Sequence, residues 1–277
     1  MLLPEMPEVE TLRRGLAKAT SGQHITSVRI SDERVLKRDQ ASAFVDRLMG
    51  ASVKDVNRRG KYLLIAMGSA GLPVFHLVVH LNMKGSIRKL PFDASLQKYE
   101  CMRVGLSSGH ALVYTDMWTW GDWHIDVASD YRNVSDVAEM GPEPLDEGWS
   151  GEVLAGRLAG KRGLIKSVLL DQKIVAGVGN IYADEALFAA GIAPTRQASG
   201  LEIAECDALA VSIAETLGSA VGCGGSQGEY VDLDGNPGTY EPKVYGGKGK
   251  PCPRCGGQLV KISIGGRGTT YCPDCQH

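Results

Sequence analysis

The first part of the chain changes from a helical to a strand-like spacing of apolar residues. From Pro7 onward, Val9, Leu12 and Leu16 recur every three or four positions, which predicts a helix with one apolar face. Pro7 suits the first turn of a helix, where its missing N–H has no partner to lose. The amino terminus is therefore predicted to run directly into a helix.

Short apolar runs then follow one another, separated by Gly, Ser or Asp. Their Val, Ile and Leu content predicts strands at 24–31, 51–57, 61–67, 72–83, 101–107 and 111–117. Several short strands at close spacing are typical of a β-sandwich or a barrel. We assign this domain to residues 1–130.

The second half has a helical pattern. Apolar periodicity predicts helices over 151–160, 164–172 and 180–191, the last ending at a glycine with a proline beyond it. Ser199 followed by Glu202 resembles a capping box that opens a helix running to about Val221. The glycine-rich stretch 222–242 is predicted to be a loop.

Size and composition set broad limits. The chain has 277 residues, 43% hydrophobic and 22% charged, which is typical of a soluble globular protein with room for two domains. It contains no apolar run of the ~18 residues that a membrane helix needs, and no secretory signal pattern. We therefore expect a cytosolic protein without a membrane partner.

Charge is unevenly distributed along the chain. The formal net charge is −2, which by itself does not favour nucleic acid as a partner. From Lys243 to His277, however, six basic residues face one acid, Asp274. This local excess of positive charge is sufficient to engage several phosphates.

Four of the seven cysteines lie in the last 26 residues, as Cys252, Cys255, Cys272 and Cys275. Their C-x2-C-x16-C-x2-C spacing predicts a structural zinc site; two disulfides are the alternative, which a cytosolic location disfavours. The alternating run between the pairs predicts a β-hairpin with Arg267 at its tip. That arginine is either a solvated turn residue or a contact to a phosphate or groove.

A glycine turn lies between two of the predicted helices. Gly177, Gly179 and Asn180 give a helix–turn–helix arrangement whose second helix begins with free N–H groups, a ready site for an anion. Arg162 and Lys166 add positive charge just before the turn. A plain helical hairpin is the alternative.

Taken in series, these segments resemble the bacterial formamidopyrimidine-DNA glycosylase family, also called 8-oxoguanine DNA glycosylases. The similar segments are PEMPEVETLRRGL, RRGKYLL, HLNMKG, LLDQKIVAGVGNIYADEALF, VYGGKGKPCPRCG and GRGTTYCPDCQ, and they cover nearly the whole chain in the family's order.

The resemblance implies an α+β fold. It consists of an N-terminal helix with a β-sandwich, then a helical helix-two-turn-helix domain, then a β-hairpin zinc finger with one structural Zn²⁺. The corresponding segments are 1–130, a linker at 131–149, 150–240 with the lesion loop, and 241–277.

The resemblance also implies the catalytic residues. Pro4 matches the family's N-terminal proline, whose amine attacks C1′ of the damaged nucleotide, and Glu5 matches the proton donor to the opening sugar. Lys61 matches the lysine that assists β-elimination, and Arg267 the arginine that assists δ-elimination. Glu185 matches the buried acid on the helix after the turn.

Further residues match contacts to DNA. Met83 matches the methionine that fills the gap left by a flipped base. Asn180 and Lys166 match phosphate contacts, with Arg162 nearby. The loop at 226–240 matches the segment that folds over the extruded base, in the form typical of the purine-directed branch.

The sequence departs from the family pattern at its start. Met1-Leu2-Leu3 precede Pro4, so that its nitrogen is part of a tertiary amide unless those residues are absent. Either Leu3 marks the true start codon and is trimmed to expose Pro4, which we favour, or the chain retains the extension and does not cleave bases.

A second departure concerns DMWTWG at 116–121, where the family has D-x-R-R-F-G. Trp118 and Thr119 replace two arginines, Trp120 replaces a phenylalanine, and Tyr99 lies where many members carry a DNA-contacting histidine. An indole stacks more than it reads a base edge, so we expect weaker discrimination of the base opposite the lesion. Alternation along an extended chain would place both tryptophans on one side.

We therefore expect a monomeric bacterial DNA glycosylase and lyase that acts on duplex DNA containing oxidised purines or abasic sites. Two other functions stay open. One is a non-catalytic binder of damaged or abasic DNA, and the other is a glycosylase that prefers oxidised pyrimidines.

Overall fold

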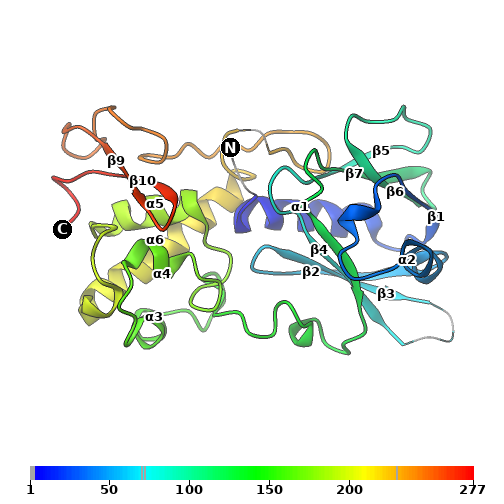
Figure 1. Ribbon diagram of the computed structural model, residues 1–277, viewed down its shortest axis with the longest axis horizontal. Coiled ribbons are helices and arrows are strands. Elements are labelled where there is room, and N and C mark those ends of the chain that lie inside the picture. Colours follow the sequence, from blue (N-terminus) through cyan, green and yellow to red (C-terminus); the bar gives the residue numbers. More distant parts are fainter. Residues whose placement is uncertain (1–3, 70, 72, 229) are drawn as a thin grey trace. The chain divides into compact units, whose positions relative to one another are not determined.

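The computed structural model describes residues 4–69, 71, 73–228 and 230–277, and these form two compact units. One unit holds the residues up to Glu139 together with Gly224–Thr239, and the other holds Met140–Cys223 and Tyr240–His277 (Figure 1). The segment predicted as the lesion loop thus packs with the N-terminal unit rather than with the helices that precede it. The boundaries predicted for the segments 1–130, 131–149, 150–240 and 241–277 remain predictions.

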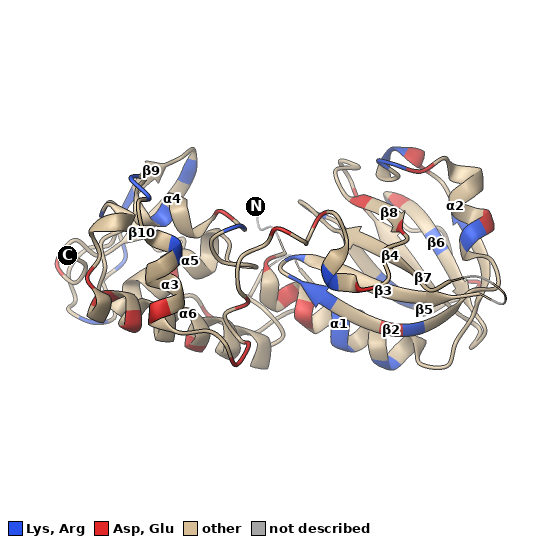
Figure 2. Cartoon of the chain, turned by 90° about the horizontal axis from the view of Figure 1, so that it is seen from below, with Lys and Arg blue, Asp and Glu red and all other residues tan. Residues whose placement is uncertain are grey.

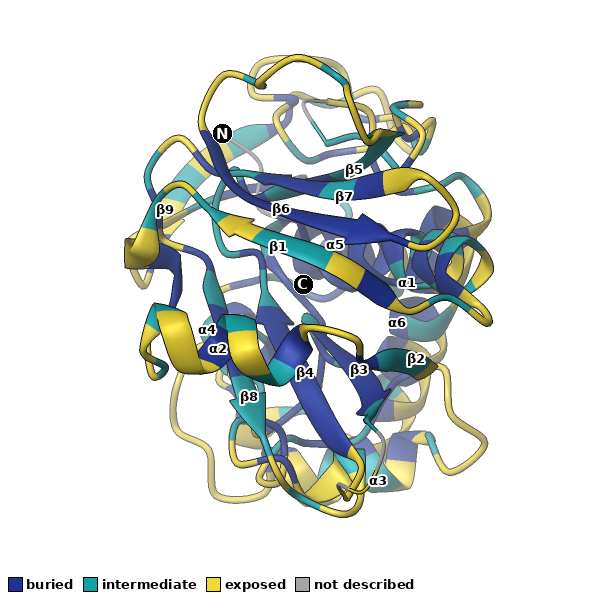
Figure 3. Cartoon of the chain, turned by 90° about the vertical axis from the view of Figure 1, so that its right-hand side faces the viewer, coloured by how far each residue is buried: buried dark blue, intermediate teal, exposed yellow. Residues whose placement is uncertain are grey.

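The N-terminal unit is a sandwich of two antiparallel four-stranded sheets (Figure 3). In order across the first sheet, the strands are β1 Ile25–Ile30, β6 Glu100–Leu106, β7 His110–Thr115 and β5 Ser86–Pro91. In order across the second sheet, they are β2 Ser52–Arg59, β3 Tyr62–Gly68, β4 Phe75–His80 and β8 Asp122–Asp126. The predicted sandwich is confirmed. Sequence analysis did not predict strands β5 and β8.

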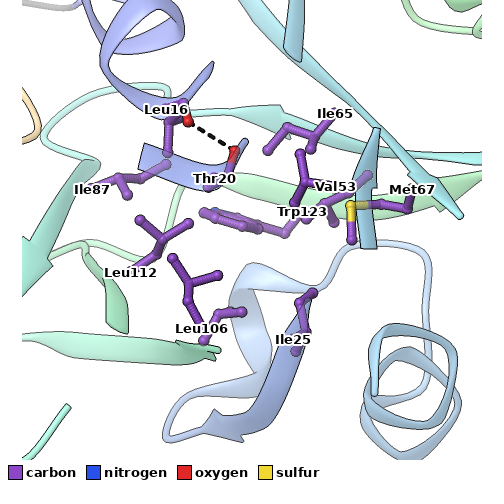
Figure 4. Close-up of a pocket in the computed structure, with 12 residues that line it drawn as sticks. Leu16, Thr20, Ile25, Val53, Ile65, Met67, Ile87, Leu106, Leu112 and Trp123 are labelled. Carbon is purple, nitrogen blue, oxygen red and sulfur yellow. Dashed lines mark hydrogen bonds between the residues drawn. The ribbon is translucent and has the colours of Figure 1, made fainter. Parts of the chain in front are cut away.

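Helix α1, Met6–Thr20, packs its apolar residues into the core between the sheets. Leu16 from the helix meets Ile65 and Trp123 from the second sheet around a small apolar cavity of ≈ 30 Å³ (Figure 4). Thr20 at the end of the helix returns its hydroxyl to the Leu16 carbonyl (2.8 Å), so that its polar group is satisfied in this apolar setting. The predicted first helix is thus the element that joins the amino terminus to the core.

Shorter elements complete this unit. They are η1 Glu33–Val35, α2 Ala41–Leu48 and η2 Tyr131–Asn133. Sequence analysis missed α2, an eight-residue helix that buries only Phe44 and Leu48. The strand predicted at 72–83 is shorter, beginning at Phe75, and residue 72 lies outside the described part of the chain.

The second unit is helical and ends in a β-hairpin. Its elements are α3 Gly151–Leu158, α4 Ile165–Leu169, α5 Asn180–Ala190, η3 Ala198–Gly200, α6 Ile203–Gly222, β9 Val260–Ile264 and β10 Arg267–Tyr271. Helix α6 packs against α3 and α5, and β10 packs against α5 (Figure 1). None of the described helices is long and apolar enough to cross a membrane.

The capping box predicted at Ser199 is wrong. Ser199 lies in η3, and the box that opens α6 is formed by Glu202 and Glu205, whose carboxylate accepts the Glu202 N–H (2.9 Å). Glutamate is an uncommon N-cap, so a search for Ser or Thr selected a residue three positions too early.

Candidate active site and DNA-binding surface

The start of α1 is held by a reciprocal capping box. Glu5 is the N-cap; its N–H donates to Glu8 Oε2 (2.9 Å), and its carboxylate accepts the N–H of Glu8 in return. Pro4, Glu5 and Glu8 are all buried. The two residues predicted to act on the sugar are therefore part of a packed helix start and not of a frayed tail.

Glu8 also ties α1 to the segment Gly224–Thr239. Its Oε1 accepts the backbone N–H (2.8 Å) and the hydroxyl (3.1 Å) of Ser226, a residue 218 positions away. Further along this segment, Leu233 is buried in the core and Asp234 pairs with Lys89 (2.7 Å). The predicted lesion loop, apart from residue 229, which is outside the described chain, is therefore anchored to α1, to the core and to β5.

Lys61 lies in the tight turn between β2 and β3, directly after Gly60, whose φ of 55° is left-handed. The hairpin is fixed to α1 because Arg58 Nε donates to Glu10 Oε2 (3.1 Å). Burial on its own would raise the pKa of Glu10, but hydrogen bonds from Arg13 and its neighbours outweigh burial and lower that pKa to about 2. Lys61 is therefore presented by a turn that is anchored to the same helix as Glu5.

The loop at 116–121 is built around the carboxylate of Asp116. Oδ1 accepts the N–H groups of Trp118 and Thr119 (3.0 Å each), and Oδ2 accepts the Gly121 N–H (2.8 Å) and the Tyr114 hydroxyl (3.0 Å). A Cβ atom on Gly121 would lie 1.8 Å from Tyr114 Oη, so only glycine fits there. One buried side chain thus fixes the backbone of the whole loop.

The two tryptophans of this loop contact one another, with ring centroids 4.9 Å apart. Trp120 is 49% exposed and Trp118 is partly buried. The two side chains lie together, as predicted. The predicted cause, alternation along an extended strand, is wrong, because Thr119 has a φ of 56° and the chain turns at this residue. Thr119 itself is buried and its carbonyl accepts from Lys37 Nζ (2.9 Å), which argues against a direct contact to DNA.

Two neighbouring turns meet the tryptophan loop. Asn82 Nδ2 donates to the Trp120 carbonyl (2.6 Å), so the turn that carries half-buried Met83 is fastened to the loop. The Asp116 N–H donates to the carbonyl of Tyr99 (3.0 Å), whose side chain is 47% exposed. Met83, Tyr99 and Trp120 are therefore presented by three connected loops.

In the second unit, the glycine turn is organised by a side chain that sequence analysis missed. Gln172 Oε1 accepts the Gly177 N–H (2.8 Å), and Nε2 donates to the Val178 carbonyl (3.0 Å). Asn180 begins α5 as predicted, but its Nδ2 donates to the carbonyl of Gly268 in β10 (3.0 Å). The amide that was expected at a phosphate therefore joins the turn to the hairpin in this structure.

The structure gives Lys166 a different place from the predicted one. Its side chain has no exposure, and its ammonium donates to Asp184 Oδ1 and to the Asn180 carbonyl (2.8 Å). Asp184 Oδ2 accepts the Thr270 N–H (3.0 Å). A fully enclosed ammonium does not reach a phosphate, so the direct contact predicted for Lys166 is replaced by support of the turn and of β10.

Glu185 is also buried, and its carboxylate accepts three consecutive backbone N–H groups. These belong to Lys243 (2.7 Å), Val244 (2.9 Å) and Tyr245 (2.8 Å), which lead into the cysteine-rich segment. Its position on α5 is as predicted, and its contacts hold the chain that precedes the finger.

Four thiols converge at the end of the second unit. The sulfurs of Cys252 and Cys275 are 3.9 Å apart, and those of Cys255 and Cys272 are 3.6 Å apart, with all four ligand atoms within 4.8 Å. Backbone N–H groups of Arg254 and Gly257 point at two of the sulfurs, as suits thiolates. This donor set fits one tetrahedral Zn²⁺.

The charges of the second unit are segregated. The acids of α6 lie along that helix, whereas basic residues lie near β9 and α4 (Figure 2). Arg162 is exposed before α4, and Arg267 is exposed at the first position of β10, paired with Ile264 across the two-glycine turn. The finger and the stretch before α4 therefore carry exposed positive charge in this unit.

Comparison with known proteins gives the same picture. The formamidopyrimidine-DNA glycosylase N-terminal domain model matches residues 3–123, the H2TH domain model of the same family matches 140–231, and the zinc finger found in FPG and IleRS matches 249–277. Formamidopyrimidine-DNA glycosylase of Laribacter hongkongensis is 39% identical, over 99% of this chain and 100% of its own. The chain belongs to the formamidopyrimidine-DNA glycosylase family.

Solved structures of this family agree closely with the fold. The Lactococcus lactis enzyme in complex with DNA containing N7-benzyl-Fapy-dG has a TM-score of 0.91 at 35% identity, over 99% of this chain and 100% of that one. An Escherichia coli formamidopyrimidine-DNA glycosylase is 40% identical, over 99% of this chain and 100% of its own. As a member of this family, the protein is a DNA repair glycosylase with AP lyase activity and a structural zinc finger.

Within this glycosylase, the residues that sequence analysis missed are anchors. Gln172, Asp116 and Ser226 each hold a functional segment through hydrogen bonds to the backbone or to a buried carboxylate. Gln172 and Asp116 both lie beside a glycine-containing turn, a local signal that could have identified them. Ser226 had no such signal, because its partner Glu8 is distant in the sequence.

Proposed function

We propose that this glycosylase excises oxidised purines through the secondary amine of Pro4 and then cleaves the abasic site by β,δ-elimination. Relatives have been solved with DNA containing N7-benzyl-Fapy-dG, carbocyclic 8-oxo-G and an abasic site. The single observation that carries the proposal is the capping box that fixes Glu5, directly after the buried Pro4, at the start of α1.

The chemistry conserves atoms and charge. The lone pair of the Pro4 amine forms a bond to C1′, and the base departs with the electrons of the glycosidic bond and takes up the proton that the Pro4 nitrogen loses. The C1′–O4′ bond then breaks, Glu5 delivers a proton to the sugar oxygen, and the nitrogen lone pair completes the iminium. Removal of a C2′ proton then expels the 3′ phosphate, and a second elimination expels the 5′ phosphate, with Lys61 and Arg267 assisting these two steps.

The reaction requires that Pro4 be the first residue. In the chain with residues 1–3 present, the Pro4 nitrogen belongs to a tertiary amide and has no basic lone pair. A start at Leu3, read as Met and then trimmed, gives a secondary amine. The N-terminal domain match begins at residue 3, which is consistent with this start.

DNA is bound by residues of both units in this proposal. Arg162, Arg267 and the turn at Asn180 engage phosphates, while Lys166 and Glu185 act by positioning the turn and the finger. Met83, Tyr99, Trp118 and Trp120 contact the bases left behind when the lesion is flipped. We also expect the protein to act as a monomer in the bacterial cytosol.

A second substrate class is supported by one specific neighbour. The Lactococcus lactis enzyme has been solved with DNA containing an oxidised pyrimidine, at a TM-score of 0.90 and 35% identity. The other alternative, a non-catalytic binder of abasic DNA, applies to a chain that keeps the residues before Pro4.

Excision assays test the proposal. A chain that begins at Pro4 should release Fapy-dG and 8-oxoguanine from duplex DNA and nick the strand, and its Glu5→Gln variant should bind the same DNA but release base at least about 100-fold more slowly. An oxidised-pyrimidine duplex measures the second class. Binding without release of any of these bases by the trimmed chain would refute the proposal.

A further inference from the structure

The N-terminal unit contains a cluster of side chains that can bind a metal ion, whereas the four cysteines of the finger belong to the second unit. Asp122 and His124 are two residues apart on β8 and therefore face the same side of the sheet. Asp136 follows η2, in a segment whose Val134 and Val137 are buried. These three side chains bring their ligand atoms within 4.8 Å of one another.

His124 lies between the two carboxylates. Its Nδ1 is 3.2 Å from Asp122 Oδ1, and its Nε2 is 3.3 Å from Asp136 Oδ2. The residue is only 2% exposed, and Nε2 is buried without a hydrogen-bond partner among the described residues. A buried ring nitrogen without a hydrogen bond thus lies beside a carboxylate oxygen.

This geometry leaves a neutral imidazole in conflict. Neutral histidine carries a proton on one nitrogen and a lone pair on the other. If Nδ1–H faces Asp122, the lone pair of Nε2 faces the carboxylate of Asp136; the other tautomer moves the same repulsion to Asp122. A cation between the lone pair and the carboxylate removes the conflict.

The surrounding charge is also unbalanced. Arg38 is the positive partner of both acids, with Nη2 2.6 Å from Asp136 Oδ1, 2.7 Å from Asp136 Oδ2 and 3.6 Å from Asp122 Oδ2. Burial, and then the charges of Asp136 and Asp122, raise the pKa of the adjacent Tyr62 to about 12, whereas the charge of Arg38 lowers that pKa. The neighbouring His80 is neutral at pH 7, because burial and then Lys61 lower its pKa to about 4.

We propose that His124 Nε2 and the Asp136 carboxylate bind a divalent first-row transition metal of the zinc type, in addition to the zinc of the finger, while Asp122 accepts the Nδ1–H of the ligating ring. A ligand set that mixes imidazole and carboxylate suits zinc, cobalt or manganese, whereas Ca²⁺ and Mg²⁺ prefer oxygen ligands alone. Arg38, whose side chain is 44% exposed, competes with the ion for the same oxygens and moves toward water when it binds. The bound ion fastens the segment after η2 onto β8.

The test is a metal titration of the full chain with its finger already loaded with zinc. Adding Co²⁺ should produce one further equivalent of bound metal by elemental analysis, with a visible d–d absorption band. His124→Gln and Asp136→Asn should each lose that equivalent and its band. His110→Gln, which alters an exposed histidine of the same unit, should keep both.

Arg38→Gln keeps the test decisive even where a ligand variant folds poorly. Removing the competing guanidinium should tighten Co²⁺ binding by about tenfold or more, which is the effect expected of a lost neighbouring positive charge. If the wild-type chain and Arg38→Gln both bind metal only at the finger, the proposal is wrong. A second equivalent that persists in His124→Gln would also overturn it.

Discussion

The loop at 116–121 and the turn at 177–180 solve one structural problem with different chemistry. Each is a tight turn held by a single side chain, Asp116 in the first and Gln172 in the second. The carboxylate of Asp116 only accepts hydrogen bonds, so it gathers N–H groups. The amide of Gln172 both accepts and donates, so it holds an N–H and a carbonyl of the turn together.

The difference shows where this family member can change. In the 116–121 loop the anchor is the buried carboxylate of Asp116, and the tryptophan side chains make none of the hydrogen bonds by which Asp116 holds the backbone. In the second turn the presented residue, Asn180, is also tied to β10 and lies over the Lys166–Asp184 pair. In the proposed function, the residues that contact DNA in the 116–121 loop differ from the residue that holds the loop. In the 177–180 turn, Asn180 does both.

The largest loss of stability is expected from Lys166→Met, which leaves Asp184 buried without its cation. We expect the free energy of unfolding to fall by about 3–5 kcal/mol at pH 8, measured by urea denaturation. Lys161→Met, an exposed neighbour, should change it by less than about 0.5 kcal/mol. Equal stability of the two variants would show that the pair does not support the turn.

The same variant has a signed pH dependence. Burial raises the pKa of Asp184 from 3.8 to about 6 even with Lys166 beside it, and removal of the cation raises it further. The folded state then binds a proton that the unfolded state does not, so stability rises as the pH falls. The deficit of Lys166→Met should therefore be smaller at pH 5 than at pH 8.

Asp116→Asn comes next. The asparagine oxygen can still accept from Trp118 and Thr119, but its NH₂ group would face the Gly121 N–H, donor against donor. We expect a loss of about 2–3 kcal/mol in unfolding free energy, against no loss for the exposed control Asp93→Asn. An unchanged midpoint would mean that the loop is not built on this carboxylate.

Gln172→Ala should cost less, about 1–2 kcal/mol, because neutral hydrogen bonds are lost and water can replace part of them. Since this turn merges support with recognition, we also expect weaker binding to duplex DNA that contains an abasic-site analogue. Fluorescence anisotropy at fixed salt measures it. Full affinity with reduced stability would separate the two roles and contradict the comparison.

Trp120→Ala should have the smallest effect on stability, within about 0.5 kcal/mol, because the side chain is half exposed. Its effect on DNA is larger: loss of one stacked base is worth about 1–3 kcal/mol of affinity. Excision opposite C, A, G and T should be similar in the native chain. A strong preference for C would refute stacking as the means of reading the opposite strand.

Local chemistry explains how much the sequence predicts. The spacing of Val9, Leu12 and Leu16 gave the first helix, and the cysteine spacing gave the finger, because both depend on residues close together in the chain. The start of α6 was misplaced because glutamate acts as its N-cap, and the tryptophan pair was found for the wrong reason because Thr119 takes a left-handed conformation.

Contacts between segments that are distant in the chain could not be predicted from the sequence. No periodicity links Glu8 to Ser226, Asn180 to Gly268 or Lys166 to Asp184, although these contacts decide which candidate residues are exposed. The burial of Lys166 is the clearest case: its basic character near a glycine turn suggested a phosphate contact, and its partner Asp184 is visible only in the folded chain.

The central claim is that the Pro4 amine forms the bond to the sugar. Borohydride reduction of the enzyme with an abasic-site duplex, followed by peptide mapping of the trapped adduct, tests it directly. We predict that a chain beginning at Pro4 is trapped through that residue, while a chain that retains Met1-Leu2-Leu3 binds the duplex without trapping. Equal trapping of both chains, or an adduct mapped to Lys61, would contradict the account.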